Sequence, residues 1–426
     1  MLYLSFTFFI SNLTFHFIFF YNFVLYIFAL RLIKSEQMSI LNFDENFLKE
    51  KGAFHTAAEI ESQPDLWLSV YRGVKEKSRE LQKFMDAALA ESAKIILAGA
   101  GTSAYIGLSL HSMFTRKLGK QALAIPTTDL VTHPANYFSG NDTLMLISFA
   151  RSGNSPESMA AVELADRLCR KVFHLVVTCD RKGNLAMMNT HNPLYVHVLP
   201  PESNDQSLAM TGSYSGMLLS GLLIASLAEI SSFEKKVQRL HLYGNTIIRK
   251  YSQSLRQIAD MPFKRAVFLG SGPFFGTATE SALKLQELTD GRIICKNESF
   301  LGLRHGPKAV IDNETLLFYI FSGDPYVVNY ERDLANSMKK GNNPLITIGL
   351  SEKPVPGCST DAFIVLSDSE ILGDDELLTV CNILPGQLLG FYKSLGMGLK
   401  PDNPSVNGSI SRVVENVKIY QFGQQG

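Results

Sequence analysis

The chain has 426 residues, 46% of them hydrophobic, which is long and apolar enough to bury the cores of two or three domains. Its 40 basic residues balance 40 acidic residues, so no large positive field attracts nucleic acid, and we expect no nucleic-acid partner. The 5 cysteines lie far apart and form no C-x-x-C pair, which predicts buried thiols in a reducing compartment, the cytoplasm.

Residues 1–37 form a hydrophobic extension. Residues 1–33 are almost wholly apolar or aromatic, carry Arg31 as their only charge, and exceed the ~20 residues that span a bilayer. Two interpretations stay open: a membrane anchor, or an upstream extension of a chain whose translation starts at Met38. A signal peptide fits less well, because no basic residue precedes the apolar run and no small-residue cleavage site follows it. We therefore expect a membrane partner only if residues 1–37 belong to the mature protein.

After Met38 the composition changes to charged, soluble sequence, and residues 38–80 are predicted to form a helical segment. An apolar spacing through Trp67, Val70, Val74 and Leu81 gives this segment one buried face. We expect it to serve packing rather than chemistry.

An internal repeat organises the rest of the chain. Three strand-like segments recur at an offset of 171 or 172 residues: 94–101 with 265–272, 142–148 with 314–320, and 174–178 with 345–349. Each is a short apolar run followed by a helix-length stretch, which is typical of a parallel sheet covered on both faces. The sequence therefore predicts an α/β fold with two doubly wound domains, residues 81–235 and 260–426, joined by a helix over 236–259.

In the first copy, the strand at 94–98 runs into the loop 99–103, and a helix is predicted to start near Ala104. Such a turn points backbone N–H groups and the positive end of a helix dipole at an anion, with the Thr102 and Ser103 hydroxyls as further donors. A plain strand-to-helix turn explains the loop equally well on its own. A dinucleotide is not favoured, because the G-x-G-x-x-G pattern fails at Ala104.

The next strand, ending at Ala150, leads into a second hydroxyl-rich loop, RSGNS, over residues 151–155. Ser155 followed by Pro156 is typical of a helix start, so capping and ligand contact are both open for Ser155. Because the carboxyl ends of neighbouring parallel strands meet at one edge of a sheet, we expect the two loops to converge on one phosphate.

Four motifs resemble, in sequence and order, the double-SIS isomerase module of glucosamine-6-phosphate synthase: AGTS (100–103), RSGNS (151–155), KLQE (284–287) and LRHGP (303–307). The resemblance covers about residues 85–426. Within that superfamily, residues 42–67 and the segment ALKLQELTDGRI look most like the AgaS-type galactosamine-6-phosphate deaminase/isomerase branch, also known as tagatose-6-phosphate ketose/aldose isomerase. The resemblance implies two tandem SIS domains, each a doubly wound parallel sheet flanked by helices.

The resemblance also implies which residues hold a sugar phosphate. Ser103, Ser152 and Ser155 match family positions that bind the phosphate. Ala150 stands where the synthase has a serine and Arg151 replaces a glutamine, so a guanidinium would hold part of the phosphate here. The expected binding residues are Gly101, Thr102, Ser103, Arg151, Ser152, Ser155, Thr211 and Arg412.

Three further residues are implied to act in catalysis. Glu287 matches the base that moves a proton between C1 and C2, and Lys284 lies one helical turn before it. His305 matches a ring-opening histidine that in this family comes from the neighbouring subunit, so a homodimer with a shared active site is implied. These residue types fit, because ring opening needs an acid/base group that titrates near neutral pH and isomerisation needs a carboxylate beside C2. Without the resemblance, a Lys284–Glu287 salt bridge and a structural histidine are the plainer interpretations.

The second copy of the repeat has lost most hydroxyls from its loops at 270–273 and 322–325. We therefore expect one phosphate site per chain. His191 and His197 flank a strand-like run without a metal-binding spacing, so we expect both to be structural and no metal site.

Arg412 bears on the direction of the reaction. It stands where the synthase has a lysine that forms a Schiff base with a ketose, which a guanidinium cannot do. This argues against amide-driven synthesis and for release of ammonia. We therefore expect a cytoplasmic enzyme that converts galactosamine 6-phosphate to tagatose 6-phosphate and ammonia without a cofactor. Plain isomerisation of tagatose 6-phosphate and non-catalytic sensing of a phosphosugar are the alternatives.

Overall fold

The computed structural model describes residues 39–338, 341, 343–367, 369–414 and 417–423. The hydrophobic extension predicted over residues 1–37 lies outside the described residues. The chain divides into two compact units, Met1–Glu50 and Lys51–Gly426. The described part of the first unit holds a short antiparallel pair and most of one helix: β1 (Ser39–Ile40), β2 (Phe43–Asp44) and α2 (Glu45–Lys51).

The second unit opens with three helices: α3 (Phe54–Glu61), α4 (Gln63–Glu76) and α5 (Ser78–Glu91). Trp67, Val70 and Val74 lie on the buried face of α4, as their spacing predicts. Pro64 stands in the first turn of α4, where a missing N–H costs no intrahelical hydrogen bond.

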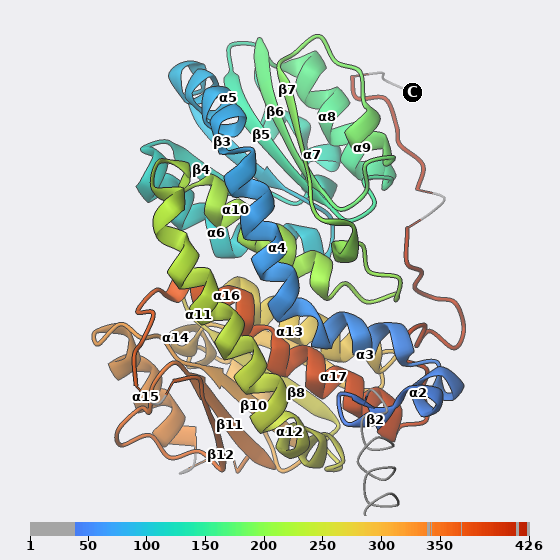
Figure 1. The fold of residues 1–426 in the computed structure, drawn as a ribbon, viewed down its shortest axis with the longest axis vertical. Helices are drawn as coiled ribbons and strands as arrows, with labels where there is room; N and C mark the ends of the chain where they lie inside the picture. The colour runs from blue at the N-terminus through green and yellow to red at the C-terminus, as the bar shows by residue number, and fades with distance from the viewer. Residues whose placement is uncertain (1–38, 339–340, 342, 368, 415–416, 424–426) are drawn as a thin grey trace, which may run out of the picture. The chain divides into compact units, whose positions relative to one another are not determined.

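Five parallel strands form the first sheet, in the spatial order β4-β3-β5-β6-β7 (Figure 1). The strands are β3 (Lys94–Ala98), β4 (Gln121–Ala124), β5 (Thr143–Ala150), β6 (Lys171–Thr178) and β7 (Leu194–Val198). β5 is buried along its whole length, because helices cover both faces of a parallel sheet and select continuous apolar runs. The helices of this domain are α6 (Thr102–Leu118), α7 (Thr127–Thr132), η1 (Pro134–Asn136), α8 (Pro156–Leu168), α9 (Asn184–Met187), η2 (Pro201–Ser203) and α10 (Gly212–Ile224).

The second sheet repeats this topology, in the order β12-β11-β10-β8-β9, again with parallel strands throughout. The strands are β8 (Arg265–Gly270), β9 (Ile294–Glu298), β10 (Thr315–Ile320), β11 (Ile346–Ser351) and β12 (Ala362–Val365). Its helices are α13 (Phe274–Leu288), α14 (Phe300–Leu303), η5 (Pro307–Val310), α15 (Val327–Met338), α16 (Asp375–Asn382) and α17 (Leu384–Gly396). The two sheets confirm the predicted α/β fold of two doubly wound domains.

Helical segments connect the domains: η3 (Leu227–Ser232), α11 (Phe233–Thr246), a π-helical turn η4 (Ile247–Tyr251) and α12 (Ser252–Ala259). Every residue of α10 is buried, and α10 packs against α4, α6 and α16. Among the described residues, no single helix is long and apolar enough to cross a membrane, and one pair bent by 110°, Gly212–Ile224 with Leu227–Ala259, passes on length and composition alone.

Helices α6 and α13 pack against each other in opposite directions. Thr102, at the start of α6, contacts Glu280 and Lys284 in the second half of α13. Ser109, in the middle of α6, donates a hydrogen bond to the Pro273 carbonyl, just before α13 begins. Each helix therefore starts at the edge of its own sheet and ends toward the edge of the other sheet.

Candidate active site

A cavity opens at the carboxyl edge of each sheet, where the strand order reverses. The first cavity, of about 570 Å³, lies beyond β3 and β5, and the second cavity, of about 760 Å³, lies beyond β8 and β10. Open α/β sheets bind ligands at such points, because the loops leaving the strands diverge there and form a crevice. Both cavities are therefore candidate sites, and their side chains decide between them.

Close backbone packing shapes the loop after β3. A Cβ atom on Gly99 would lie 2.5 Å from the Ser103 carbonyl carbon, so only glycine fits there. Gly101 has a φ of 54°, in the left-handed region that favours glycine. α6 begins at Thr102 rather than near Ala104. The structure places Gly101, Thr102 and Ser103 on the wall of the first cavity.

The loop after β5 brings Arg151, Ser152 and Ser155 to the same cavity. Ser155 stands at the N-cap of α8, but its hydroxyl lies 2.6 Å from the Ser158 hydroxyl and makes no capping hydrogen bond. The Ser152 oxygen accepts a hydrogen bond from the Asn154 N–H at 3.3 Å, a local turn that leaves the hydroxyl proton available to a ligand. Two hydroxyl-rich loops thus face one space, as the sequence predicted.

A charged cluster on α13 forms the wall opposite these loops. Lys284 is fully buried, and its ammonium donates to Glu287 Oε2 at 2.5 Å and to the Thr102 hydroxyl at 3.0 Å. Burial acts to lower the pKa of Lys284, but the neighbouring carboxylates outweigh it and raise that pKa. Lys284 is therefore a charged ammonium that holds Glu287, whose side chain is 24% exposed, at the edge of the cavity.

Glu280 completes this cluster, and the sequence reasoning missed it. It lies one helical turn before Lys284, is fully buried, accepts a hydrogen bond from the Thr102 hydroxyl at 3.2 Å and lies 3.4 Å from the Lys284 ammonium. Burial raises the pKa of Glu280 to about 8. The spacing of Glu280, Lys284 and Glu287 at i, i+4 and i+7 on one helix face was the available signal.

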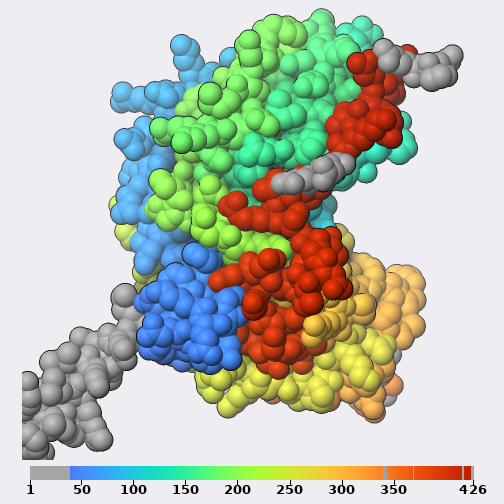
Figure 2. Space-filling model, turned by 90° about the vertical axis from the view of Figure 1, so that its right-hand side faces the viewer, coloured from blue at the N-terminus to red at the C-terminus, as the bar shows by residue number. Residues whose placement is uncertain are grey.

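The C-terminal segment closes the first cavity from outside. Residues 408–414 line it, and Figure 2 shows this segment (red) running over the surface toward the first domain. The Arg151 guanidinium donates to the carbonyls of Ser207 and Leu208, each at 3.2 Å, and to the Arg412 carbonyl. Both arginines line the cavity. Arg151, however, donates these hydrogen bonds to backbone carbonyls, and the one to Arg412 fastens the C-terminal segment.

Arg412 fastens the same segment from its other side. Its guanidinium donates to the Asp205 carbonyl at 3.0 Å and to the Asn204 side chain at 3.0 Å. The Asp205 carboxylate in turn accepts the Thr211 N–H at 2.8 Å and the Thr211 hydroxyl at 3.2 Å, at the start of α10. Thr211 is fully buried and is not among the described residues that line the first cavity.

His305 lies apart from the cluster on α13. It follows α14 in an exposed segment and is not among the described residues that line the first cavity. Within this chain, the structure therefore brings Lys284 and Glu287 together and leaves His305 on the surface.

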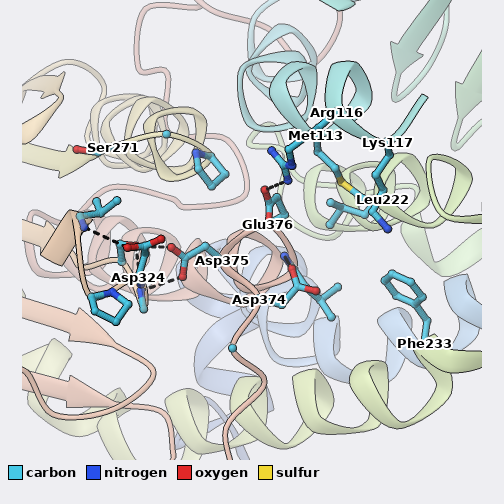
Figure 3. A pocket seen from close by; sticks show the side chains of 18 residues that line it. Met113, Arg116, Lys117, Leu222, Phe233, Ser271, Asp324, Asp374, Asp375 and Glu376 are labelled. Atoms are coloured by element: carbon cyan, nitrogen blue, oxygen red, sulfur yellow. Dashed lines mark hydrogen bonds and ion pairs between the residues drawn. The ribbon is translucent and has the colours of Figure 1, made fainter. Parts of the chain in front are cut away.

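The second cavity has the same architecture with different chemistry (Figure 3). By the repeat offset of 171 residues, Arg116 corresponds to Glu287 and Met113 to Lys284, and both line the second cavity. The Arg116 guanidinium pairs with Glu376 at 2.6 Å. A guanidinium is a poor base, so the position that Glu287 occupies in the first cavity carries no base in the second, although Asp374 and Glu376 also line that cavity.

Carboxylates of the protein already occupy the loop after β10. The Ser322 N–H donates to Glu331 at 2.8 Å, the Gly323 N–H donates to Asp375 at 2.9 Å, and the Ser322 hydroxyl also donates to Asp375. As in the first domain, the serine oxygen accepts an N–H two residues ahead, from Asp324 at 3.0 Å. The hydroxyl proton of Ser152 is therefore available to a ligand, whereas that of Ser322 is taken by Asp375.

In the described part of the chain, no three His, Cys, Asp or Glu side chains lie together as metal ligands would. Burial lowers the pKa of His197 to about 4, so this imidazole is neutral. His174, fully buried on β6, contacts Asp166 at 2.6 Å as part of the first domain's core.

Known proteins resemble this chain in sequence and in fold. A family model described as the SIS domain matches residues 88–227. A D-galactosamine-6-phosphate deaminase AgaS from Shewanella sp. (strain ANA-3) is 39% identical over 381 residues, 88% of this chain and 94% of that protein. The crystal structure of tagatose-6-phosphate ketose/aldose isomerase from Escherichia coli matches with a TM-score of 0.79 and 34% identity, covering 87% of this chain and 97% of that one.

A more distant structure shares the fold alone. The C-terminal domain of glucosamine-fructose-6-phosphate aminotransferase from Francisella tularensis matches with a TM-score of 0.68 at 15% identity, covering 81% of this chain and 96% of that one. The AgaS protein, in contrast, is 39% identical to this chain over nearly the whole of its length. The chain therefore belongs to the AgaS-type family of double-SIS sugar-phosphate deaminases and isomerases.

Proposed function

We propose that this protein converts galactosamine 6-phosphate to tagatose 6-phosphate and ammonia, with the first cavity as its active site. The observation that carries the proposal is the Lys284–Glu287 pair, a buried ammonium 2.5 Å from a partly exposed carboxylate, facing two hydroxyl-rich loops in one cavity. A carboxylate held at the edge of a cavity can accept a proton from a substrate bound there. The name of the Shewanella relative supports the choice of substrate.

The two loops would bind the 6-phosphate. Ser103 lines the cavity in the first turn of α6, where the positive end of the helix dipole favours an anion. The hydroxyl proton of Ser152 and the hydroxyls around Ser155 would add donors from the second loop. A phosphate held there orients the sugar so that its other end, C1 and C2, reaches toward α13.

Glu287 would then move one proton. After ring opening gives the free aldehyde, the Glu287 carboxylate removes the proton from C2, which forms an enolamine as the aldehyde oxygen is protonated. Glu287 returns its proton to C1, which leaves an imine at C2. Water adds to this imine carbon, ammonia leaves, and the ketone of tagatose 6-phosphate remains. The carboxylate is regenerated, so the sequence of steps needs no redox partner.

Ring opening would depend on a second subunit. We assign it to His305, which is exposed here and lies outside the first cavity of its own chain. The segment that carries His305 also presents apolar side chains that are open to water, Leu301 (48% exposed) and Val310 (36%). A homodimer would bury these side chains and deliver the histidine to the neighbouring site.

The compartment belongs to the same proposal. All five cysteines are free thiols, in keeping with the reducing cytoplasm. An intact-mass measurement of the native protein shows whether residues 1–37 are retained and hence whether a membrane-tethered form exists.

The test is ammonia release and ketose formation by the full chain with galactosamine 6-phosphate and with glucosamine 6-phosphate. Ammonia from the galacto epimer, lost in Glu287→Gln while substrate binding remains, is the expected result. No ammonia from either sugar overturns the deaminase.

Plain isomerisation of tagatose 6-phosphate is the second candidate, favoured by the name of the Escherichia coli structure. It uses the same base and differs only in a hydroxyl in place of the amine at C2. Turnover of tagatose 6-phosphate without ammonia release from either amino sugar would establish it. Tight binding of all three sugars without any turnover would instead identify a phosphosugar sensor.

A further inference from the structure

The cluster on α13 holds one buried ammonium between two carboxyl groups. Lys284 lies 2.5 Å from Glu287 Oε2 and 3.4 Å from Glu280 Oε1. If both carboxyl groups were ionised, the cluster would carry one uncompensated negative charge inside the protein, which is costly in a low dielectric. One of the two therefore holds a proton.

Burial decides which carboxyl group is protonated. Glu280 is fully buried, whereas the Glu287 side chain is 24% exposed at the cavity. A charge is least stable where water is absent, so the proton belongs on Glu280 and the charge on Glu287. In agreement with this, burial raises the pKa of Glu280 to about 8.

The contacts of Glu280 suit a neutral group. Its Oε1 accepts a hydrogen bond from the Thr102 hydroxyl, whose oxygen in turn accepts one from Lys284. Its Oε2 is buried and makes no hydrogen bond to any residue that the structure describes. A carboxylate oxygen left in this way would lose its hydration without compensation, which a protonated carboxyl group tolerates better.

We propose that Glu280 is a positioning residue that works in its neutral form: it accepts a hydrogen bond from the Thr102 hydroxyl and lies beside the Lys284 ammonium, whose charge then pairs with Glu287 alone. The inference rests on the proposed function, because it concerns the base of the same site. The other titratable groups that face Glu280 are Tyr105 on α6 and Tyr214 on α10, and the raised pKa of each keeps it neutral through the same pH range. Ionised Glu280 would draw the ammonium away from Glu287 and weaken its orientation.

The test compares Glu280→Gln with Glu280→Ala across pH 6 to 9, measuring kcat and KM separately. We expect Glu280→Gln to keep nearly the wild-type kcat at pH 6.5, because an amide reproduces the neutral acceptor. Wild-type kcat should fall through one ionisation near pH 8 that is absent from Glu280→Gln. Titration of the substrate amine affects both proteins equally and cancels in the comparison. Glu280→Ala should lose about 10-fold or more in kcat with KM little changed, because Lys284 and Thr102 lose their support.

Two results overturn the proposal: Glu280→Gln as impaired as Glu280→Ala at pH 6.5, or identical pH profiles for Glu280→Gln and the wild type. The matched control is Glu331→Gln, another buried carboxyl group but beside the second cavity, which should leave the kcat profile unchanged. Thermal denaturation supplies a readout that needs no turnover. The midpoint of Glu280→Gln, relative to that of the wild type, should rise from pH 6 to pH 9, because only the wild type can ionise Glu280. An inactive wild type would overturn the proposed function, and the denaturation midpoints would still test the protonation of Glu280.

Discussion

The two cavities belong to the two copies of one repeat, yet corresponding positions in them carry different side chains. They occupy the same place on their sheets, beyond β3 and β5 in one domain and β8 and β10 in the other. In the first cavity Lys284 and Glu287 face loops with available hydroxyls. In the second, Met113 and Arg116 stand at the corresponding positions and Asp375 fills the loop. Duplication of the fold has therefore not duplicated the site.

The difference also explains why a single domain would not suffice. Because α6 and α13 pack in opposite directions, α13 carries Lys284 and Glu287 out of the second domain and into the cavity of the first. The first domain contributes Thr102, which contacts Lys284 directly. The candidate active site is thus assembled between the halves of the repeat, one supplying the anion loops and the other the base.

The largest effect should come from exchanging the base. Glu287→Gln removes the group that carries the proton between C1 and C2, so we expect kcat to fall about 10³-fold while KM stays similar. Arg116→Gln changes the corresponding position of the second cavity and should leave kcat and KM unchanged. Steady-state kinetics on both variants checks this. An equal loss in both would mean that the two cavities act together.

The second prediction tests the different use of the Ser152 and Ser322 hydroxyls. In Ser152→Ala the phosphate loses a hydroxyl donor, and because hydrogen bonds to charged groups contribute about 1.5–3 kcal/mol, KM should rise roughly 10- to 100-fold with a smaller change in kcat. In Ser322→Ala the hydroxyl loses its contacts to Asp375 and to the Asp324 N–H, neither of which lies in the first cavity, and KM should not change. A rise in KM for Ser322→Ala alone would place the phosphate in the second cavity.

Much of this contrast could be predicted from the sequence, because it depends on local patterns. The continuous apolar run of β5 predicts a buried parallel strand, and the hydroxyl-rich loop after it follows directly in the chain. Lys284 and Glu287 are three residues apart on one helix, so their contact follows from helix geometry. The loss of hydroxyls from the second copy was equally visible.

The rest depends on contacts between residues far apart in the chain. Arg151 reaches the Arg412 carbonyl across 261 residues, so its use in fastening the C-terminal segment has no local signal. Asp375 lies 53 residues beyond the Ser322 hydroxyl that it occupies. Glu280 lies four residues before Lys284, a helical spacing that the sequence shows, but only its complete burial distinguishes it from an ordinary surface carboxylate.

The third prediction concerns stability rather than turnover. Asp375→Ala removes the acceptor of the Gly323 N–H and the Ser322 hydroxyl, and the loss of two hydrogen bonds from partly buried donors should lower the free energy of unfolding by about 2 kcal/mol. Activity should remain, because the first cavity is untouched. Glu376→Gln, next to it on α16, breaks only an ion pair with the exposed Arg116 and should cost less than about 1 kcal/mol. Urea denaturation distinguishes the two, and a full loss of activity in Asp375→Ala would contradict the assignment of one site per chain.

The smallest effect is a pH dependence centred on the second cavity. Burial raises the pKa of Glu331, beneath the Ser322 loop, to about 8 from an unfolded value of 4.5. Between these values the folded state binds the proton that the unfolded state has released, so this group's contribution to stability falls as pH rises toward 8. Glu331→Gln keeps the hydrogen-bond acceptor but cannot ionise. Its free energy of unfolding, relative to wild type, should therefore rise by about 1 kcal/mol between pH 7 and pH 8, whereas kcat stays the same at both. A constant difference across this range would mean that Glu331 is already ionised in the folded protein and that the second cavity carries more negative charge than the first.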